Sequence, residues 1–550
     1  MDKKNFLALA LIAVIIVTYP LYMQWVTGKK AKTAVPKQET VETDTSGTKT
    51  ITSPSVLSID SRPSSTDTAI QEKIVKVETD LYKAEFSTKS AVLTSFIVKK
   101  YKYSGSDKAI ELVLPDGPGA LEVLLGDSLV VQFKTDLDGL VLSSVTDTGT
   151  VTFIGTTADG ATIVKRYTFY NEEYHFGLKV ELSGILGSEL KKNYTLAWSS
   201  GLAPTEKELR EDLQYFEAYS MMGKELRGTK KFKKENNSGI EILEESNSGQ
   251  TEWVATKTKY FLACLVPLSQ RGSGFSAYGQ RWFTQTGQQK VEHKKIGVAL
   301  EMPITNQGVV KDSFMVYLGP LDYLKLKHYR MGLENTVDLG WKIIKPFSIA
   351  ILWIFVNLHR FIPNYGVVII IFTFLMKIVL HPLTFKSTKS MSKMQQIQPK
   401  VTELREKHKD DPQRMNQEMM KLYKQQGVNP FGGCLPLLLQ MPLFYGLFVI
   451  FRSTIELRGA EFAWWLKDLS QKDPYYILPL IMSAAMFWQQ KMTIKDPKQK
   501  AMVYLMPILF FFLFKGFPAG LTLYWTLYNI LSLVEQYYLK DKSTTEVVAQ

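Results

Sequence analysis

The chain carries a lysine inside a stretch that is otherwise apolar. Residues 366–385 read GVVIIIFTFLMKIVLHPLTF, with Lys377 near the middle, and about 20 such residues suffice to cross a bilayer. An ammonium group near the bilayer interior costs roughly 2.5–3.5 kcal/mol, so it usually faces a protein interior or a water-filled cavity. Thr373, one helical turn earlier, would share its helix face. We expect a hydrated groove that bears one cation; the alternative is that Lys377 snorkels to the nearer interface.

Other polar residues recur inside apolar segments nearer the C-terminus. Three of them follow one another at helical spacing and form a stripe on one face, which Ser532 continues. In lipid such groups must find partners or water. Each threonine alone could bond to its own backbone, but together with Lys377 the set indicates a shared hydrophilic groove. The groove candidates are Lys377, Thr373, Gln440, Thr522, Thr526 and Asn529.

Signatures of catalysis and of metal binding do not occur in the sequence. The six histidines show neither HxxxH nor HExxH spacing, and Cys264 and Cys434 are too few for a disulfide framework or a thiol-rich metal site. The glycine-rich RGSGFSAYG at residues 271–279 lacks the strand and helix that a phosphate-binding loop needs, so we expect a plain loop. We expect no enzyme activity, no cofactor and no metal.

Charge and composition point to a membrane protein. The net charge of +13 over 550 residues could suggest a nucleic-acid partner, but no nucleic-acid-binding motif appears, so we expect no such specificity. Basic cytoplasmic loops produce the same surplus in membrane proteins.

The N-terminal region reads as an anchor followed by a tether. Within residues 1–27 an apolar run starts after Lys3 and Lys4 and ends in interfacial aromatic residues such as Trp25. It is longer than the core of a cleaved signal peptide, so we expect an uncleaved transmembrane anchor. Residues 28–72 are rich in Thr, Ser, Lys and Pro and predict a flexible periplasmic linker.

Residues 73–335 predict a periplasmic antiparallel β-sandwich. Short alternating runs are bounded by Gly, Asp or Asn, and Asp159-Gly160 is a strong hairpin signal between VTFIGTT and TIVKRYTFY. No paired carboxylates support the carbohydrate binding that fold analogy would allow, so we expect a scaffold or interaction domain. In one of these strands, the residues predicted to face the core of the domain are Phe176, Leu178, Val180 and Leu182.

The rest of the chain predicts an α-helical core. Residues 336–363 have an apolar part too short for a span and predict an interfacial helix. Residues 541–550 form a short tail after the core, which extends over residues 364–540. Five transmembrane spans are expected in this core, at about 364–385, 431–451, 475–490, 501–515 and 518–539.

Residues 386–427 predict a cytoplasmic helical hairpin with a break at KHKDDPQR. Residues 386–426 hold ten Lys or Arg and five acidic residues, and this basic surplus, repeated in the loop 489–500, places both termini in the cytoplasm and residues 28–363 largely in the periplasm. Apolar residues repeat at spacings of three and four, which favours a packed seam; a soft, adaptable client surface is the alternative. The methionines concerned are Met391, Met394, Met415, Met419 and Met420.

Four segments resemble the bacterial YidC family of membrane protein insertases, to which mitochondrial and plastid insertases are related. The resemblance is close over about the last third of the chain, and the whole layout agrees with the form found in Gram-negative inner membranes. The segments are FTFLMKIVLHPLT (372–384), QEMMKLYKQQGVNPFGGCLPLLLQMPLF (417–444), DPYYILP (473–479) and FPAGLTLYWTLYN (517–529).

The resemblance implies five spans around a positively charged groove that opens to the cytoplasm and to lipid. The groove arginine of the family falls on Lys377, which keeps the charge without the planar fork of arginine; Thr373 matches another groove position. The short tail lacks the long basic extension of some members, so we expect weak or transient ribosome binding. The positions that match the family's client sliding surface are Met441, Pro442, Tyr524 and Trp525.

We therefore expect a membrane protein insertase and chaperone that works on nascent membrane-protein clients in the lipid bilayer, alone or with the Sec translocon. The alternative is a polytopic channel or transporter with an external binding domain, but the inverted repeats or paired broken helices typical of transporters do not occur. An intramembrane hydrolase would need a Ser/His or Asp/Asp pair within a span, and none is evident.

Overall fold

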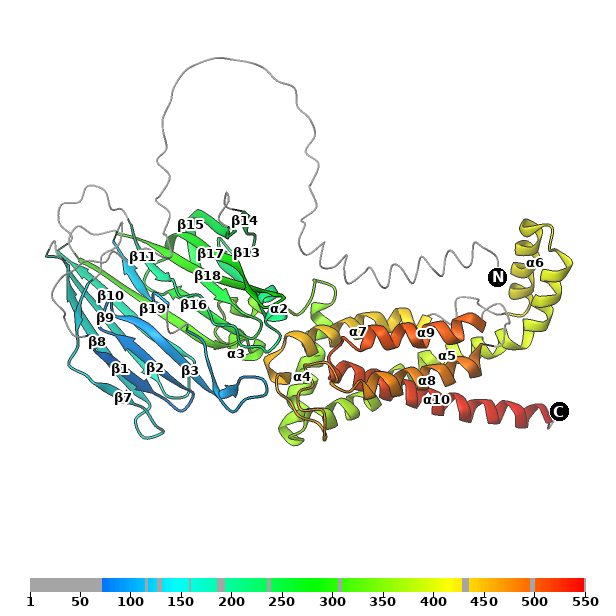
Figure 1. The fold of residues 1–550 in the computed structure, drawn as a ribbon. Coiled ribbons are helices and arrows are strands. Elements are labelled where there is room, and N and C mark those ends of the chain that lie inside the picture. Colours follow the sequence, from blue (N-terminus) through cyan, green and yellow to red (C-terminus); the bar gives the residue numbers. More distant parts are fainter. Residues whose placement is uncertain are drawn as a thin grey trace, which may run out of the picture. The chain divides into compact units, whose positions relative to one another are not determined.

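A computed structural model of the chain separates into two units. The β unit lies within Lys49–Val337 and the helical unit within Asp338–Gln550, and their elements are labelled in Figure 1. The expected anchor (1–27) and all of the expected linker except its last residue lie outside the described residues. The described residues are 72–113, 117–125, 131–157, 160–184, 193–234, 239–304, 309–427, 435–494 and 500–548.

The smaller sheet of the β unit has five strands. Its pairs are antiparallel, except that β1 and β7 run parallel. In spatial order the strands are β4 (Ala109–Glu111), β3 (Val92–Lys102), β2 (Tyr82–Ser87), β1 (Ile74–Glu78) and β7 (Gly139–Val141).

The larger sheet has 14 strands, and its pairs are antiparallel. Its main path runs β5 (Glu122–Leu124), β11 (Asn193–Trp198), β18 (Gln289–Pro303), β17 (Gly272–Thr286), β15 (Glu241–Lys257), β16 (Phe261–Pro267), β19 (Val309–Pro320), β10 (His175–Ser183), β9 (Thr162–Tyr170), β8 (Thr148–Thr156) and β6 (Phe133–Lys134). Off this path, β12 (Glu217–Met222) and β14 (Lys233–Lys234) pair with β15, and β13 (Glu225–Thr229) pairs with β12. The β unit also has two short helices, α2 (Leu209–Asp212) and α3 (Tyr323–His328).

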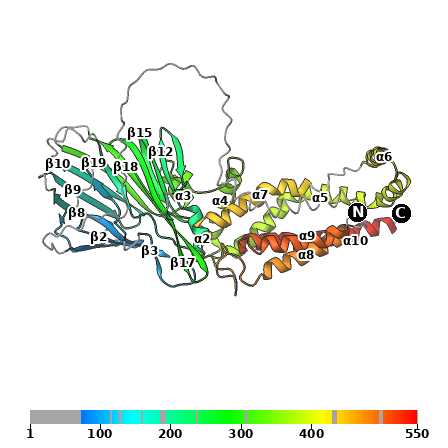
Figure 2. The same ribbon diagram turned by 45° about the horizontal axis from the view of Figure 1, so that its top comes forward.

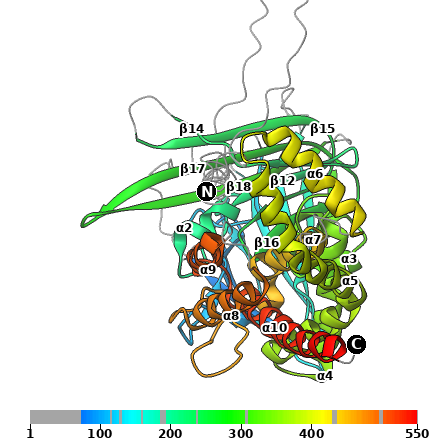
Figure 3. The same ribbon diagram turned by 90° about the vertical axis from the view of Figure 1, so that its right-hand side faces the viewer.

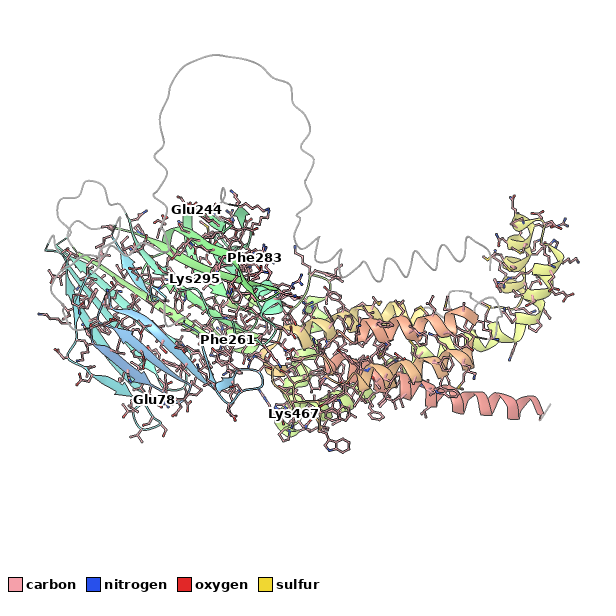
Figure 4. All side chains as sticks on the ribbon, viewed as in Figure 1. Glu78, Glu244, Phe261, Phe283, Lys295 and Lys467 are labelled. Carbon is pink, nitrogen blue, oxygen red and sulfur yellow. The ribbon has the colours of Figure 1, made fainter. Side chains whose placement is uncertain are left out.

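The two sheets pack face to face (Figure 2), and aromatic side chains from both meet between them. Phe86 of β2 lies 4.7 Å from the Tyr167 ring of β9, and 5.7 Å separate the rings of Tyr101 in β3 and Phe261 in β16; Phe261 is labelled in Figure 4. Such rings bury large apolar areas and give two-sheet cores much of their stability. The alternation predicted for β10 is confirmed, because its four predicted core residues are fully buried.

The prediction of a loop at residues 271–279 is wrong. Residues 272–279 begin β17, which pairs with both β15 and β18. Glycine is needed there because the neighbouring strands approach closely: a Cβ at Gly279 would clash with the carbonyl oxygen of Lys295, and one at Gly274 would lie 2.5 Å from the Glu301 carboxylate. Glycines in a strand can mark such a close approach as well as a loop.

Lys165 of β9 binds two loop segments of the β unit from inside the core. Its Nζ donates to the carbonyl oxygens of Ser90 at 2.9 Å, Ala91 at 3.2 Å and Leu121 at 2.9 Å. All three acceptors have positive φ angles, between 46° and 67°, a region that residues other than glycine seldom adopt. Burial lowers the pKa of Lys165 to about 7.

We predict that this lysine makes the β unit more stable as the pH rises. Between about pH 7 and pH 9 the unfolded chain keeps the Lys165 proton while the fold releases it, so the free energy of unfolding should rise by about 2 kcal/mol. Urea unfolding at the two pH values measures this rise, and Lys165→Met should flatten it. An equal rise in the free energy of unfolding in the wild type and in Lys165→Met would contradict the prediction. Lys294, whose pKa burial lowers to about 8, is present in both proteins and contributes equally to each.

The helical unit consists of seven described helices (Figure 3). Helix α8 packs against α9 and α10, α10 also packs against α5, and α4 packs against α7. Of the described residues, Tyr365–Pro382 form the one stretch long and apolar enough to cross a membrane, while Lys500–Phe514 is a shorter apolar helix. The helices are α4 (Lys345–Phe361), α5 (Tyr365–Lys407), α6 (Pro412–Gln425), α7 (Leu435–Ser453), α8 (Ile477–Thr493), α9 (Lys500–Phe514) and α10 (Ala519–Val548).

Helix α5 is longer than the sequence predicts. The expected span (364–385) and the first helix of the expected hairpin are one continuous helix of 43 residues, which runs through Pro382 and Pro399. A proline removes one N–H from the helix ladder, but neighbouring hydroxyl groups can bond to nearby carbonyls. Near Pro382, Thr384 Oγ1 donates to the carbonyls of Leu380 and His381 at 3.1 and 3.0 Å.

The end of α5 and helix α6 form a hairpin around a small apolar seam. Ile397 and Val401 are buried there, and Met394 and Met419 pack against them. This arrangement agrees with the seam interpretation of those two methionines. Met420 is half exposed and Met415 is partly buried, and the side chain of Met391 lies outside the described residues.

Candidate functional site

Lys377 on α5 faces α10, where it meets a carboxylate. Its Nζ lies 2.7 Å from Glu535 Oε2, donates to Ser532 Oγ at 2.8 Å, and lies 4.8 Å from the centre of the Tyr528 ring. The Lys377 side chain is 13% exposed and that of Glu535 is 18% exposed. The ammonium group therefore points into the protein between two helices, and the geometry does not support the snorkelling alternative.

Glu535 has a second basic neighbour. His381 lies one helical turn after Lys377 on α5, and its Nδ1 is 3.1 Å from Glu535 Oε1. The carboxylate thus lies between two bases that share one face of α5. Across the described ranges, no group of three His, Cys, Asp or Glu side chains could hold a metal ion.

Sequence reasoning missed Glu535 although a signal was available. The residue is a carboxylate within the apolar run ILSLVEQYYL of α10, three positions after Ser532. Residues three apart lie on the same helix face, so the polar stripe that begins at Thr522 could have been extended to it. Through its contact with α5, the cation expected from the sequence is paired with a carboxylate of α10.

Four other groove candidates use their own helix as a partner. Thr373, Thr522 and Asn529 each bond to the carbonyl four residues before, at 2.7, 3.2 and 2.8 Å. Thr526 bonds in the same way at 2.7 Å and also reaches the Leu478 carbonyl of α8 at 3.3 Å. These hydroxyl and amide groups are buried. Because they already donate hydrogen bonds to carbonyls, few of their donors remain for a client.

Buried polar atoms without a partner remain in the same bundle. Among the described residues, Gln440 Nε2 on α7 and Tyr524 OH on α10 have no hydrogen-bond partner, and the same holds for Trp525 Nε1, Ser483 Oγ and Gln490 Oε1. Buried polar groups are nearly always bonded to protein or to ordered water. The five atoms lie on α7, α8 and α10 and remain available to water or to another polar group.

The four positions matched to a client sliding surface do not share one exposed face. Met441 is 48% exposed, whereas Tyr524 is fully buried and Trp525 is 7% exposed. The Trp525 ring lies 4.9 Å from Phe444 and 6.0 Å from Phe514, so it packs inside the bundle. Pro442 lies within α7 next to Met441 and is partly buried.

Comparison with known proteins finds matches to both units. The model of the 60Kd inner membrane protein family matches residues 357–546, and the model of the YidC periplasmic domain matches residues 74–350. A protein of Pelodictyon phaeoclathratiforme named Membrane protein insertase YidC is 35% identical over 99% of this chain and 95% of its own length. A protein of the same name from Syntrophus aciditrophicus is 34% identical over 99% of this chain and 100% of its own length.

Proposed function

The chain belongs to the YidC family of membrane protein insertases, and from this premise we propose that it inserts client proteins through the region around Lys377. The family is one of inner-membrane proteins with a periplasmic domain, which corresponds to the β unit. The observation that carries the proposal is a basic side chain held between α5 and α10, close to buried polar atoms that lack partners.

In the proposed mechanism, the polar end of a client enters the hydrated interior while its apolar segment remains against lipid. Lys377 attracts carboxylates of the client, and partner-free groups such as Gln440 and Tyr524 offer hydrogen bonds to its backbone. A charged group in low-dielectric surroundings attracts more strongly than one in water. Lys377 thereby lowers the barrier to moving a polar segment.

Burial of the client's apolar segment in lipid supplies the driving force. Removal of apolar surface from water contributes roughly 25 cal/mol per Å². The free energy gained by burying a spanning segment therefore exceeds the free energy that moving the polar end costs. No nucleotide hydrolysis is required by this scheme. Met441, exposed on α7, is the proposed first contact of the sliding segment.

The remaining parts are assigned supporting roles. The basic hairpin of α5 and α6 receives clients on the cytoplasmic side, where both termini also lie, and ribosome binding is weak or transient. The β unit, with the rest of residues 28–363, lies largely in the periplasm and contacts the Sec translocon or assists folding. The distribution of Lys and Arg supports this orientation.

Crosslinking of a stalled client tests the proposal. A photoreactive residue at position 441 should crosslink to the apolar segment of a single-spanning client, while the buried positions 524 and 525 should react only after the helices separate. Position 512 is a matched control, because Phe512 on α9 is 58% exposed but has no proposed role. Equal crosslinking at 441 and 512 would contradict the proposed path.

A further inference from the structure

The ion pair between Lys377 and Glu535 means that the proposed client-binding charge already has an occupant. The two groups are 2.7 Å apart, and both side chains are largely removed from solvent. While they are paired, the negative charge of Glu535 offsets the attraction of Lys377 for any other anion. A client carboxylate must therefore displace Glu535 before it gains a full contact with Lys377.

The surroundings of Glu535 make this displacement possible. Breaking a buried pair is costly when one partner is left without compensation. Here the Glu535 side chain is 18% exposed, so solvent can take over part of the contact when Lys377 turns away. Its second oxygen, Oε1, also lies 3.1 Å from His381 Nδ1, which compensates the carboxylate when the imidazole is protonated. Lys377 in turn keeps its hydrogen bond to Ser532, whose Oγ accepts from Nζ at 2.8 Å.

We propose that Glu535 is a specificity-determining residue, a resident counter-ion that a client carboxylate exchanges with on Lys377. The inference rests on the proposed function and deepens it. Because Glu535 must first be displaced, a client carboxylate gains less from Lys377 than it would from an unpaired lysine, so Glu535 weakens the preference for acidic clients. It also competes for Lys377 afterwards, which releases the client instead of leaving it bound.

Peptide binding to the full chain in nanodiscs tests this exchange without requiring insertion. The probes are an apolar peptide with Asp residues at its polar end and the same peptide with Asn at those positions. The readout is the ratio of the Asn-peptide Kd to the Asp-peptide Kd. We expect Glu535→Gln to raise this ratio about tenfold, which corresponds to roughly 1.4 kcal/mol, because Lys377 then has no competing carboxylate.

Three further variants make the readout specific. Glu418→Gln removes an exposed carboxylate that pairs with Lys421 at 2.7 Å on α6, and it should leave the ratio unchanged although the net charge changes equally. Lys377→Gln combined with Glu535→Gln should bring the ratio close to one. Glu535→Asp keeps the charge but shortens the reach to Lys377, so it should raise the ratio by less than Glu535→Gln and serves if that variant folds poorly.

The outcomes separate this inference from the proposed function. An unchanged or lowered ratio in both Glu535→Gln and Glu535→Asp would overturn the exchange model, whatever the insertion activity. If the ratio shifts as expected but the wild-type chain inserts no client in vesicles, the proposed function fails and the exchange model stands.

Discussion

Replacement of Lys377 by alanine should lower the insertion of small acidic-tailed clients into reconstituted vesicles at least tenfold. The loss of one charge contact in a largely desolvated site corresponds to 1.4 kcal/mol or more. Lys377→Arg keeps the charge at this position and should retain most of the activity. Insertion is measured as protease-protected client per vesicle, and equal insertion by the wild type and Lys377→Ala would refute the role of this charge.

The alanine variant also destabilises the fold, which must be separated from its effect on insertion. It removes the shorter of the two basic contacts of Glu535, and this should cost roughly 2 kcal/mol. A fully buried pair would cost about 3–5 kcal/mol, but Glu535 is 18% exposed and keeps His381. The double variant Lys377→Ala/Glu535→Ala should recover thermal stability without recovering insertion. Recovery of both would assign Lys377 a structural role only.

Replacement of Gln440 and Tyr524 should make the protein more stable and less active. Gln440→Leu and Tyr524→Phe each remove a buried polar atom that has no partner within the described structure, and such an atom costs about 1–3 kcal/mol. We expect the double variant to gain about 2 kcal/mol in stability. Insertion should fall several-fold, because an apolar lining excludes the water that a polar client segment requires.

A matched variant in the β unit separates the two effects. Tyr82 is fully buried, and within the described ranges its hydroxyl lacks a partner as that of Tyr524 does. Tyr82→Phe should therefore gain stability without changing insertion. If Gln440→Leu/Tyr524→Phe leaves insertion unchanged while its stability rises, the hydrated interior is not part of the mechanism.

The sequence by itself determined the features that depend on local pattern. Alternation along β10 predicted which of its side chains enter the core, and they are buried. Spacings of three and four predicted Met394 and Met419 on facing sides of a helical seam. Such patterns are readable because one buried face repeats every two residues in a strand and about every 3.6 in a helix. The same reasoning singled out Lys377, since a charge in an apolar helix requires a special environment.

Only the tertiary structure decided what those residues meet. The partners Lys377 and Ser532 are 155 positions apart, and no local spacing shows that α5 packs against α10 with Glu535 at the contact. Packing likewise turned Trp525 inward against Phe444 and made a strand of the glycine-rich residues 272–279, which pair with residues outside that segment in β15 and β18. A pattern places a side chain on a face, but the element that covers the face is chosen by long-range packing. For that reason the sequence could predict the cation of the site and could place Glu535 on a polar helix face, but it could not identify Glu535 as the counter-ion.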